Sequence, residues 1–252
     1  MISIIIAVLN GQVAVEQCIN SVYNQSYPNK ELIIMDGGST DGTVTRLMNN
    51  TEKIAYWESG TDEGIYNAWN KALSHARGDW ICFLGADDQF WHERVLSEMF
   101  PHLMEAVAHG IQVVYGRAAM VNRKEEIIKF IGKPWEKISW LMQHGMPLPH
   151  TGLMHHRSLF NEYGLFDETF RIAADYELLL RALKNKPALY IPDCISVRWQ
   201  SGGISYDNFL SAHREMKRAL QKNGFNDFSW IWLAVHMRGI IRHYWRKIFN
   251  NH

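Results

Sequence analysis

Ser3-Ile-Ile-Ile-Ala-Val-Leu9, followed directly by Asn10-Gly11, is the stretch that decides the fold of this chain. The run is almost wholly apolar, is rich in branched side chains and ends at a turn dipeptide, a pattern typical of a short buried strand. No basic segment precedes it, and its apolar part is too short to cross a bilayer. We therefore expect a buried first strand here, and neither a signal peptide nor a membrane span.

An alternation of helices and strands extends outward from this first strand. Helical spacing over 13–23 precedes a strand at 31–35, and strands at 53–58 and 80–84 enclose a helix at 64–76. Beyond residue 88 we expect a helix at 92–104, strands at 113–120 and 126–131, an irregular segment at 134–149, a helix at 175–184, strands near 189 and 197, and two terminal helices. Such alternation predicts an α/β, Rossmann-like, mixed but mainly parallel sheet flanked by helices.

Composition restricts the class of protein further. The 252 residues carry 26 basic and 26 acidic side chains, so no net field favours nucleic acid as a partner. The three cysteines are widely separated and odd in number, which favours a reducing, cytoplasmic compartment. Residues 209–252 hold eight basic side chains against two acidic ones. We expect a catalytic domain over residues 1–205 and a basic, aromatic helical extension over residues 206–252.

Asp87 and Asp88 follow the apolar strand that ends at Leu84, where a carboxylate pair has little local basic charge to balance it. Hard oxygen ligands suit Mg²⁺ or Mn²⁺, which commonly take one or two carboxylates together with substrate phosphates. A solvated acidic turn before the next helix is the alternative interpretation. Asp36 also ends a strand, and its carboxylate can accept a hydrogen bond from a base or a sugar. No glycine-rich phosphate-binding motif of the dinucleotide or P-loop kind is present, so phosphate binding is assigned to the metal.

Several motifs, in this order and spacing, resemble glycosyltransferase family 2. They are Ile4-Ile-Ile-Ala-Val-Leu-Asn10, Cys18-Ile-Asn-Ser-Val-Tyr-Asn-Gln-Ser-Tyr-Pro28, Glu31-Leu-Ile-Ile-Met-Asp-Gly-Gly-Ser-Thr-Asp-Gly-Thr43, Asp62-Glu-Gly-Ile-Tyr-Asn-Ala-Trp-Asn-Lys71, Ala76-Arg-Gly-Asp-Trp80, Phe83-Leu-Gly-Ala-Asp-Asp88, Gly164-Leu-Phe-Asp167 and Ala173-Ala-Asp-Tyr-Glu-Leu-Leu-Leu-Arg181. The resemblance spans roughly residues 1–205. It implies the A-type glycosyltransferase fold, an inverting reaction and a nucleoside-diphosphate sugar as donor.

The resemblance also implies roles for individual residues. The loop after the first strand, with Ala7, Val8 and Asn10, would contact the nucleotide. The residues implied for the rest of the donor site are Asp36 at the nucleotide base, Asp62 in a further loop and Asp87 as the last acid of an Asp-x-Asp signature that holds the metal. Asp88, as the neighbour of Asp87, is expected to be a second metal ligand and to compensate for the departure at residue 85. Gly85 departs from the pattern, because many members carry the first aspartate of the signature there.

An inverting transfer needs a base for the proton of the acceptor hydroxyl and a cation for the departing diphosphate. The resemblance implies that Asp175 is this base. Its place at the start of a predicted helix would keep it ionised through the helix dipole. Glu177 is the reserve candidate, and His150, which precedes Thr151-Gly152, is a candidate for contact with donor or acceptor. The alternative for Asp175 is an ordinary residue of a first helical turn, and for His150 a structural histidine.

The segment 229–249 interleaves aromatic and aliphatic residues with Arg238, Arg242 and Arg246, and it contains no acid. This pattern is typical of an interfacial helix on an anionic membrane surface, although a helix packed on the core or on a second copy fits it too.

Taken together, the sequence predicts an inverting, Mg²⁺- or Mn²⁺-dependent transferase that is cytoplasmic or peripheral on the inner face of the cell membrane. It would move a sugar, expected from a UDP-sugar, to a saccharide or lipid-linked saccharide in the assembly of surface polysaccharide of the O-antigen type. A nucleotidyltransferase and a catalytically silent saccharide-binding subunit are the competing hypotheses, and Gly85 keeps the second one open.

Overall fold

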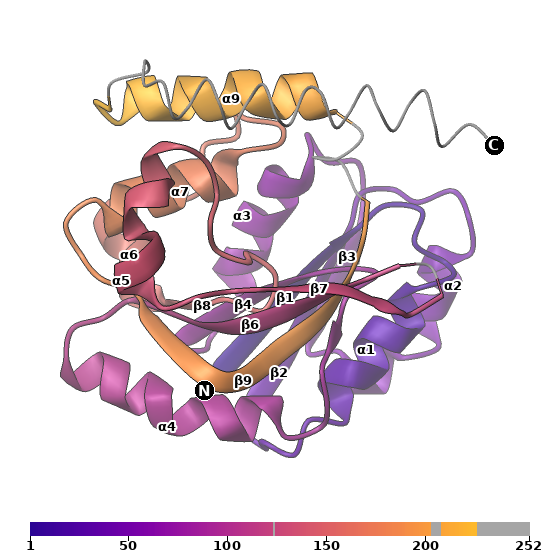
Figure 1. Cartoon of the computed structure of the whole chain (residues 1–252). Helices are drawn as coiled ribbons and strands as arrows, with labels where there is room; N and C mark the ends of the chain where they lie inside the picture. The colour runs from indigo at the N-terminus through magenta and orange to yellow at the C-terminus, as the bar shows by residue number, and fades with distance from the viewer. Residues whose placement is uncertain (123, 203–207, 226–252) are drawn as a thin grey trace.

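A computed structural model describes residues 1–122, 124–202 and 208–225 of the chain. A twisted sheet runs through the centre, and one half of it consists of the four strands β3 (Tyr56–Ser59), β2 (Lys30–Asp36), β1 (Ile2–Val8) and β4 (Trp80–Gly85), adjacent in that order and all parallel (Figure 1). β1 is in register with β2 from Ile2 to Val8. The carboxyl ends of β1, β2 and β4 therefore meet at one edge of the sheet, which is where open α/β sheets bind ligands.

The other half of the sheet is mixed. β8 (Met154–His156) runs antiparallel to both β4 and β6 (Val113–Val121), and β9 (Leu189–Gln200) runs parallel to β6. β5 (Gln89–Phe90) pairs with β9, and β7 (Ile127–Ile131) pairs with β6. The prediction of a mixed, mainly parallel sheet is confirmed by this arrangement and by the similar folds described below.

Successive side chains of a strand point to opposite faces of the sheet. Because apolar side chains lie on both faces here, helices cover both. Along β1, Ile4 and Ile6 belong to one hydrophobic cluster and Ile5 belongs to the other. The first cluster includes residues of α1 (Val15–Tyr23), α2 (Thr43–Met48) and α4 (Val95–Ala108). The second includes residues of α3 (Ile65–His75), α6 (Arg157–Tyr163), α7 (Ala174–Leu183) and α9 (Phe209–Lys222). Figure 1 shows α9 lying over α7, away from the sheet.

Some local predictions differ from the structure. The strand expected from residue 53 begins at Tyr56, because the 3₁₀ turn η1 (Thr51–Lys53) occupies its start, and the strands expected near 189 and 197 form the single strand β9. The segment 134–149, expected to be irregular, contains α5 (Trp135–Ile138) and the 3₁₀ helix η2 (Ser139–Gln143). β8 and α6 were not predicted, because three and seven residues are too few to establish a period.

The first of the two terminal helices is α9, and it packs against α7. The predicted interfacial segment 229–249 and the predicted second terminal helix lie outside the described residues. Within the described ranges, no helix combines the length and the apolar character that a membrane crossing requires. The predicted boundary between residues 205 and 206 stays a prediction.

Candidate active site

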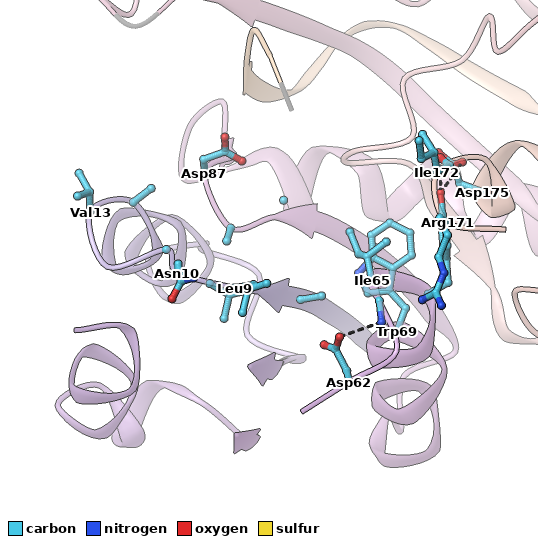
Figure 2. Close-up of a pocket in the computed structure, with 18 residues that line it drawn as sticks. Leu9, Asn10, Val13, Asp62, Ile65, Trp69, Asp87, Arg171, Ile172 and Asp175 are labelled. Carbon is cyan, nitrogen blue, oxygen red and sulfur yellow. Dashed lines mark hydrogen bonds between the residues drawn. The ribbon is translucent and has the colours of Figure 1, made fainter. Parts of the chain in front are cut away.

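A cavity of about 650 Å³ lies at the carboxyl edge of the sheet, beyond the ends of β1 and β4. It is bounded by the β1–α1 loop, the start of α3, the loop after β4 and the start of α7. Figure 2 shows Asp87 near the β1–α1 loop, and Asp175 with Arg171 on the far side of Trp69. The residues that line the cavity are Ala7, Val8, Leu9, Asn10, Gly11, Val13, Ala14, Asp62, Gly64, Ile65, Tyr66, Trp69, Gly85, Ala86, Asp87, Arg171, Ile172 and Asp175.

The cavity brings together six of the ten residues that the sequence singles out. The six that line it are Ala7, Val8, Asn10, Asp62, Asp87 and Asp175, and the four that do not are Asp36, Asp88, His150 and Glu177. The six come from four separate chain segments that only the fold makes adjacent. This shared cleft is the arrangement that the enzymatic interpretation requires, although the role of each residue stays a proposal.

The β1–α1 loop and the loop that follows β2 are joined by hydrogen bonds. Asn10 has φ +54°, a left-handed conformation that asparagine tolerates better than most residues. Its side-chain Oδ1 accepts from the backbone N–H of Thr40 at 2.9 Å, and its own N–H donates to the Oγ of Ser39 at 2.7 Å. The β1–α1 loop is therefore held in one conformation by the loop that follows β2.

Asp36 builds that second loop. Its Oδ2 accepts from the backbone N–H groups of Gly38 and Ser39 at 3.2 and 3.0 Å and from the hydroxyl of Ser59 at 2.6 Å, while Oδ1 accepts from the hydroxyl of Ser39. The residue is 3% exposed. In this conformation the carboxylate of Asp36 is hydrogen-bonded to the loop after β2. A contact with a nucleotide base would require it to give up some of these hydrogen bonds.

Gly85, the departure from the Asp-x-Asp signature, has a structural counterpart in Asp88. A Cβ at position 85 would stand 2.8 Å from Oδ2 of Asp88 and 3.1 Å from Oδ1 of Asp87. The Asp88 carboxylate thus occupies the space beside residue 85 that a side chain there would need. Oδ2 of Asp88 accepts from the N–H of Gly85 at 3.1 Å and from the hydroxyl of Thr151 at 2.6 Å.

The carboxylates of this loop differ in environment. Asp88 is 4% exposed, and burial, with the nearby charge of Asp87 as a second cause, raises the pKa of Asp88 to about 6. Its Oδ1 is buried and accepts no hydrogen bond from the described part of the chain. Asp87 is exposed and lines the cavity. Of this pair, Asp87 is therefore the carboxylate that a bound ligand meets first.

The fit of a divalent cation can be judged from these donors. Among residues 1–122, 124–202 and 208–225, no group of three His, Cys, Asp or Glu side chains surrounds a common point. Mg²⁺ is commonly held by one or two carboxylates and completes its shell with water and substrate phosphates. Asp87, open to the cavity, and the unpartnered Oδ1 of Asp88 fit a cation of that kind, which would bind together with a diphosphate.

Asp175 stands in the first turn of α7. Its Oδ1 accepts from the N–H of Tyr176 at 2.8 Å and from the hydroxyl of Tyr66 at 3.0 Å. The sequence predicts that the helix dipole keeps this group ionised, but burial is the larger influence and raises the pKa of Asp175 to about 6. A carboxylate with that pKa is ionised at pH 7 and is a stronger base than an ordinary aspartate, which suits proton abstraction.

His150 and Glu177 lie behind the cavity wall. The His150 ring stacks on Trp69 with centroids 5.2 Å apart, and burial lowers the pKa of His150 to about 3, so the ring is neutral. Glu177 is fully buried and forms ion pairs with Arg181 at 2.8 Å and Lys222 at 2.9 Å. Neither side chain reaches the cavity in this structure. The buried, ion-paired surroundings of Glu177 are those of a structural residue and not of a residue open to a ligand.

The cavity lining includes residues that were not singled out from the sequence, among them Tyr66, Trp69, Arg171 and Ile172. Tyr66 and Trp69 lie within the quoted motif 62–71, three residues apart on one face of α3, which is the signal that could have found them. Arg171 and Ile172 precede α7 in an irregular segment whose position depends on tertiary contacts. Arg171 supplies the one basic side chain among the described lining residues, and its guanidinium donates to the carbonyl of Glu63.

An open α/β sheet with a half-parallel, half-mixed strand order and an acid-lined cavity at its carboxyl edge defines the A-type glycosyltransferase fold. The sequence profile described as glycosyl transferase family 2 matches residues 3–164. The chain belongs to this family.

Curated relatives agree with this assignment. The chain is 28% identical over 211 residues to a PGL/p-HBAD biosynthesis glycosyltransferase of Mycobacterium bovis (strain BCG / Pasteur 1173P2), covering 81% of this chain and 79% of the relative. It is 30% identical over 188 residues to an uncharacterized glycosyltransferase of Mycobacterium tuberculosis (strain ATCC 25618 / H37Rv), covering 72% of this chain and 68% of the relative.

Solved structures share the fold at lower identity. S. aureus TarS 1-349 in complex with UDP superposes with a TM-score of 0.65 at 18% identity, over 90% of this chain and 67% of that one. The mannosyltransferase PcManGT from Pyrobaculum calidifontis in complex with GDP-Man and Mn²⁺ superposes with a TM-score of 0.63 at 19% identity, over 88% of this chain and 63% of that one.

Proposed function

We propose that this glycosyltransferase is an inverting enzyme that transfers a sugar from a UDP-sugar to a hydroxyl of a saccharide or lipid-linked saccharide acceptor, in the assembly of surface polysaccharide of the O-antigen type. The observation that carries this proposal is the single cavity that Asp87 and Asp175 both line. A nucleoside diphosphate at the Asp87 side would direct its sugar across Trp69 toward Asp175. One bound donor would thus reach from Asp87 to Asp175.

The proposed reaction assigns the proton and the electrons to specific groups. Asp175 takes the proton of the acceptor hydroxyl, the acceptor oxygen forms a bond to the anomeric carbon, and the bond from that carbon to the diphosphate oxygen breaks with its electron pair leaving on the diphosphate. Attack on the face opposite the leaving group inverts the anomeric configuration. A divalent cation, when bound, neutralises charge on the diphosphate, and Asp87 and Asp88 are the residues that would hold it.

The UDP-sugar and the cation are supported by proteins of similar fold. TarS 1-349 has been crystallised with UDP and with UDP-GlcNAc, and PcManGT with GDP-Man and Mn²⁺. The identity to these proteins is below 20%, so the nucleotide preference of this chain is a proposal that a direct binding experiment must test. The cavity volume of about 650 Å³ lies within the range of small-molecule sites.

A thermal-shift panel of UDP, UDP-GlcNAc, GDP, GDP-mannose and UTP, each with MnCl₂ or with EDTA, tests this proposal. A ligand that binds only the folded state at 100 times its Kd adds about 2.7 kcal/mol of stability, which corresponds to a rise in Tm of roughly 5–10 °C for a chain of this size. UDP and one or more UDP-sugars should give this rise with MnCl₂ and a smaller one with EDTA. A rise with UTP alone would favour a nucleotidyltransferase, and no rise with any nucleotide would favour a silent saccharide-binding subunit.

We also propose that the segment 229–249 binds the anionic inner surface of the cell membrane, on the strength of its arginine spacing and its aromatic content. A chain truncated after Asn226 should lose sedimentation with vesicles that contain anionic phospholipid and should stay in solution without them. Equal sedimentation of the full and the truncated chain would contradict this proposal.

A further inference from the structure

Three consecutive backbone N–H groups before α7 are bound by one side chain of α9. Glu215 accepts from Arg171 N–H through Oε1 at 2.9 Å, and from the N–H groups of Ile172 and Ala173 through Oε2 at 2.8 and 3.0 Å. Ala173 is the N-cap residue of α7 and offers no side-chain acceptor of its own. Glu215 thus supplies, from another helix, an acceptor for the N–H of the N-cap residue and for the two N–H groups that precede it.

Tyr66 connects the same segment to Asp175. Its hydroxyl lies 2.6 Å from the carbonyl oxygen of Ile172 and 3.0 Å from Oδ1 of Asp175. The side chain is 5% exposed, and its ring packs on Trp69 and Phe166. A phenol has one proton, so Tyr66 donates to one of these two acceptors at a time. The ionised carboxylate is the stronger acceptor, and the carbonyl remains available once the carboxylate has taken up a proton.

The two oxygens of Asp175 are thereby made unequal. Oδ1 receives hydrogen bonds from Tyr66 and from the N–H of Tyr176. Within the described ranges, Oδ2 accepts none of the hydrogen bonds made by this carboxylate. Since Asp175 lines the cavity, Oδ2 is the oxygen left for the proton of an acceptor hydroxyl.

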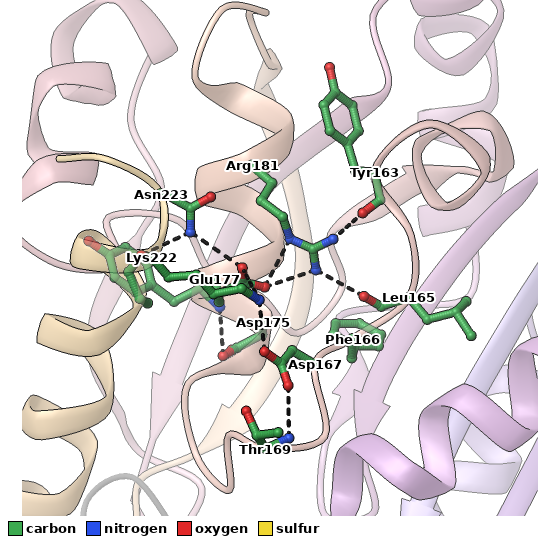
Figure 3. Close-up of polar contacts among 12 residues, drawn as sticks. Tyr163, Leu165, Phe166, Asp167, Thr169, Asp175, Glu177, Arg181, Lys222 and Asn223 are labelled. Atoms are coloured by element: carbon green, nitrogen blue, oxygen red, sulfur yellow. Dashed lines mark hydrogen bonds and ion pairs between the residues drawn. The ribbon is translucent and has the colours of Figure 1, made fainter.

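The C-terminal end of α9 is joined to α7 by an ionic network around the buried Glu177 (Figure 3). Lys222 pairs with Glu177 at 2.9 Å and with Asp167 at 2.7 Å, and the side-chain amide of Asn223 donates to Glu177 at 3.3 Å. Arg181 holds the other side of Glu177 at 2.8 Å. Glu177 is fully buried whereas Lys222 is 44% exposed, so this end of α9 is joined to α7 mainly through the buried carboxylate of Glu177.

We propose that Tyr66 and Glu215 are positioning residues for Asp175, and that α9 is therefore a part of the catalytic unit and not an appended extension. This inference rests on the proposed function, in which Asp175 is the base. The family profile ends at residue 164, before Asp175 and before α9, so the match does not supply this role.

The two positioning residues act on the charge of Asp175 in opposite directions. The hydrogen bond from Tyr66 lowers the pKa of Asp175, whereas the negative charge of Glu215 raises it. The other charged side chains among the described residues that line the cavity with Asp175 are Arg171, whose guanidinium donates to the carbonyl of Glu63, and the acids Asp62 and Asp87. Loss of the Tyr66 hydroxyl should consequently raise the pKa of Asp175, and loss of the Glu215 charge should lower it.

The test measures the pKa of Asp175 in the full chain by ¹³C NMR of protein labelled at the aspartate carboxyl carbon, with the Asp175 signal assigned as the one missing from Asp175→Asn. Tyr66→Phe should move the midpoint to higher pH, and Glu215→Gln should move it to lower pH. Tyr56→Phe, which removes a hydroxyl bonded to Glu58, and Glu16→Gln, which removes a surface partner of Arg46, are the matched controls and should leave it unchanged.

An unchanged midpoint in folded Tyr66→Phe would overturn the proposal. This holds even if Glu215→Gln fails to fold, because Tyr66→Phe preserves the packed ring. In an assay with an identified donor and acceptor, Tyr66→Phe should also lower kcat at least about tenfold near pH 6.5 and leave the KM for the donor unchanged. The reason is that a displaced catalytic base affects the chemical step and not donor binding. Retention of transfer by Asp175→Asn would instead overturn the proposed function, so the two failures are distinguishable.

Discussion

Asp175→Asn is expected to lower kcat for sugar transfer by at least about 1,000-fold and to leave the Kd for the donor unchanged, because the amide cannot accept the proton of the acceptor hydroxyl. The substitution keeps the size of the side chain and its hydrogen bonds to Tyr66 and Tyr176 can be retained through the amide oxygen. Turnover is measured as nucleoside diphosphate release in the presence of acceptor. Asp193→Asn, at an exposed position of β9, is the control and should turn over normally.

The same variant makes a prediction about stability that separates lost chemistry from lost folding. Burial raises the pKa of Asp175 to about 6, above its value in the unfolded chain, so the ionised form is less favourable in the fold than out of it. The buried carboxyl of Asp175 therefore destabilises the fold least when it is protonated at acidic pH. The free energy of unfolding falls as pH rises through about 6. Asp175→Asn avoids this loss, which is about 3 kcal/mol at pH 8, and its Tm should exceed that of the native chain by roughly 5–10 °C at pH 8, with a smaller difference near pH 4. An inactive variant with a lower Tm at pH 8 would contradict this account.

Asp87→Ala is expected to weaken binding of UDP about 100-fold when Mn²⁺ is present and to change it little in EDTA. Asp87 is the exposed carboxylate of its loop and lines the cavity, so its removal takes away a ligand from a cation that would otherwise bridge protein and diphosphate. Isothermal titration of UDP into native and variant chains, with and without Mn²⁺, measures the effect.

Asp193→Ala is the matched control for Asp87→Ala, because it removes an exposed carboxylate that does not line the cavity. An equal loss of affinity in Mn²⁺ and in EDTA would show that Asp87 contacts the nucleotide by itself. Full affinity in Mn²⁺ would remove Asp87 from the metal site altogether.

The sequence predicted the parallel half of the fold well, because its strands carry strong local signals. β1, β2 and β4 are apolar runs that end at glycine or acidic turns, and the structure places each within one or two residues of its predicted bounds. β8 was missed because its three residues, Met154 to His156, carry no period. Its existence depends on pairing with β4 and β6, which lie far away in the sequence.

The candidate site divides in the same way. Asp87 and Asp175 could be found because each stands in a motif at the end of a strand or the start of a helix. The pKa of Asp175 could not, since burial in the folded chain raises it, while Tyr66 from α3 lowers it and Glu215 from α9 raises it. Nor could the burial of His150 behind Trp69, because a lone histidine in a loop gives no sign of which residues will cover it.

The claim that the sugar donor and the catalytic base Asp175 share one cavity is tested most directly by a crystal structure of Asp175→Asn with UDP and Mn²⁺. The account predicts manganese anomalous density beside Asp87, the diphosphate between Asp87 and the end of β1, and free space from the β-phosphate to residue 175. Nucleotide bound outside this cavity would contradict the account. So would nucleotide bound inside the cavity in the reverse direction, with its diphosphate at residue 175 and its uracil ring at Asp87.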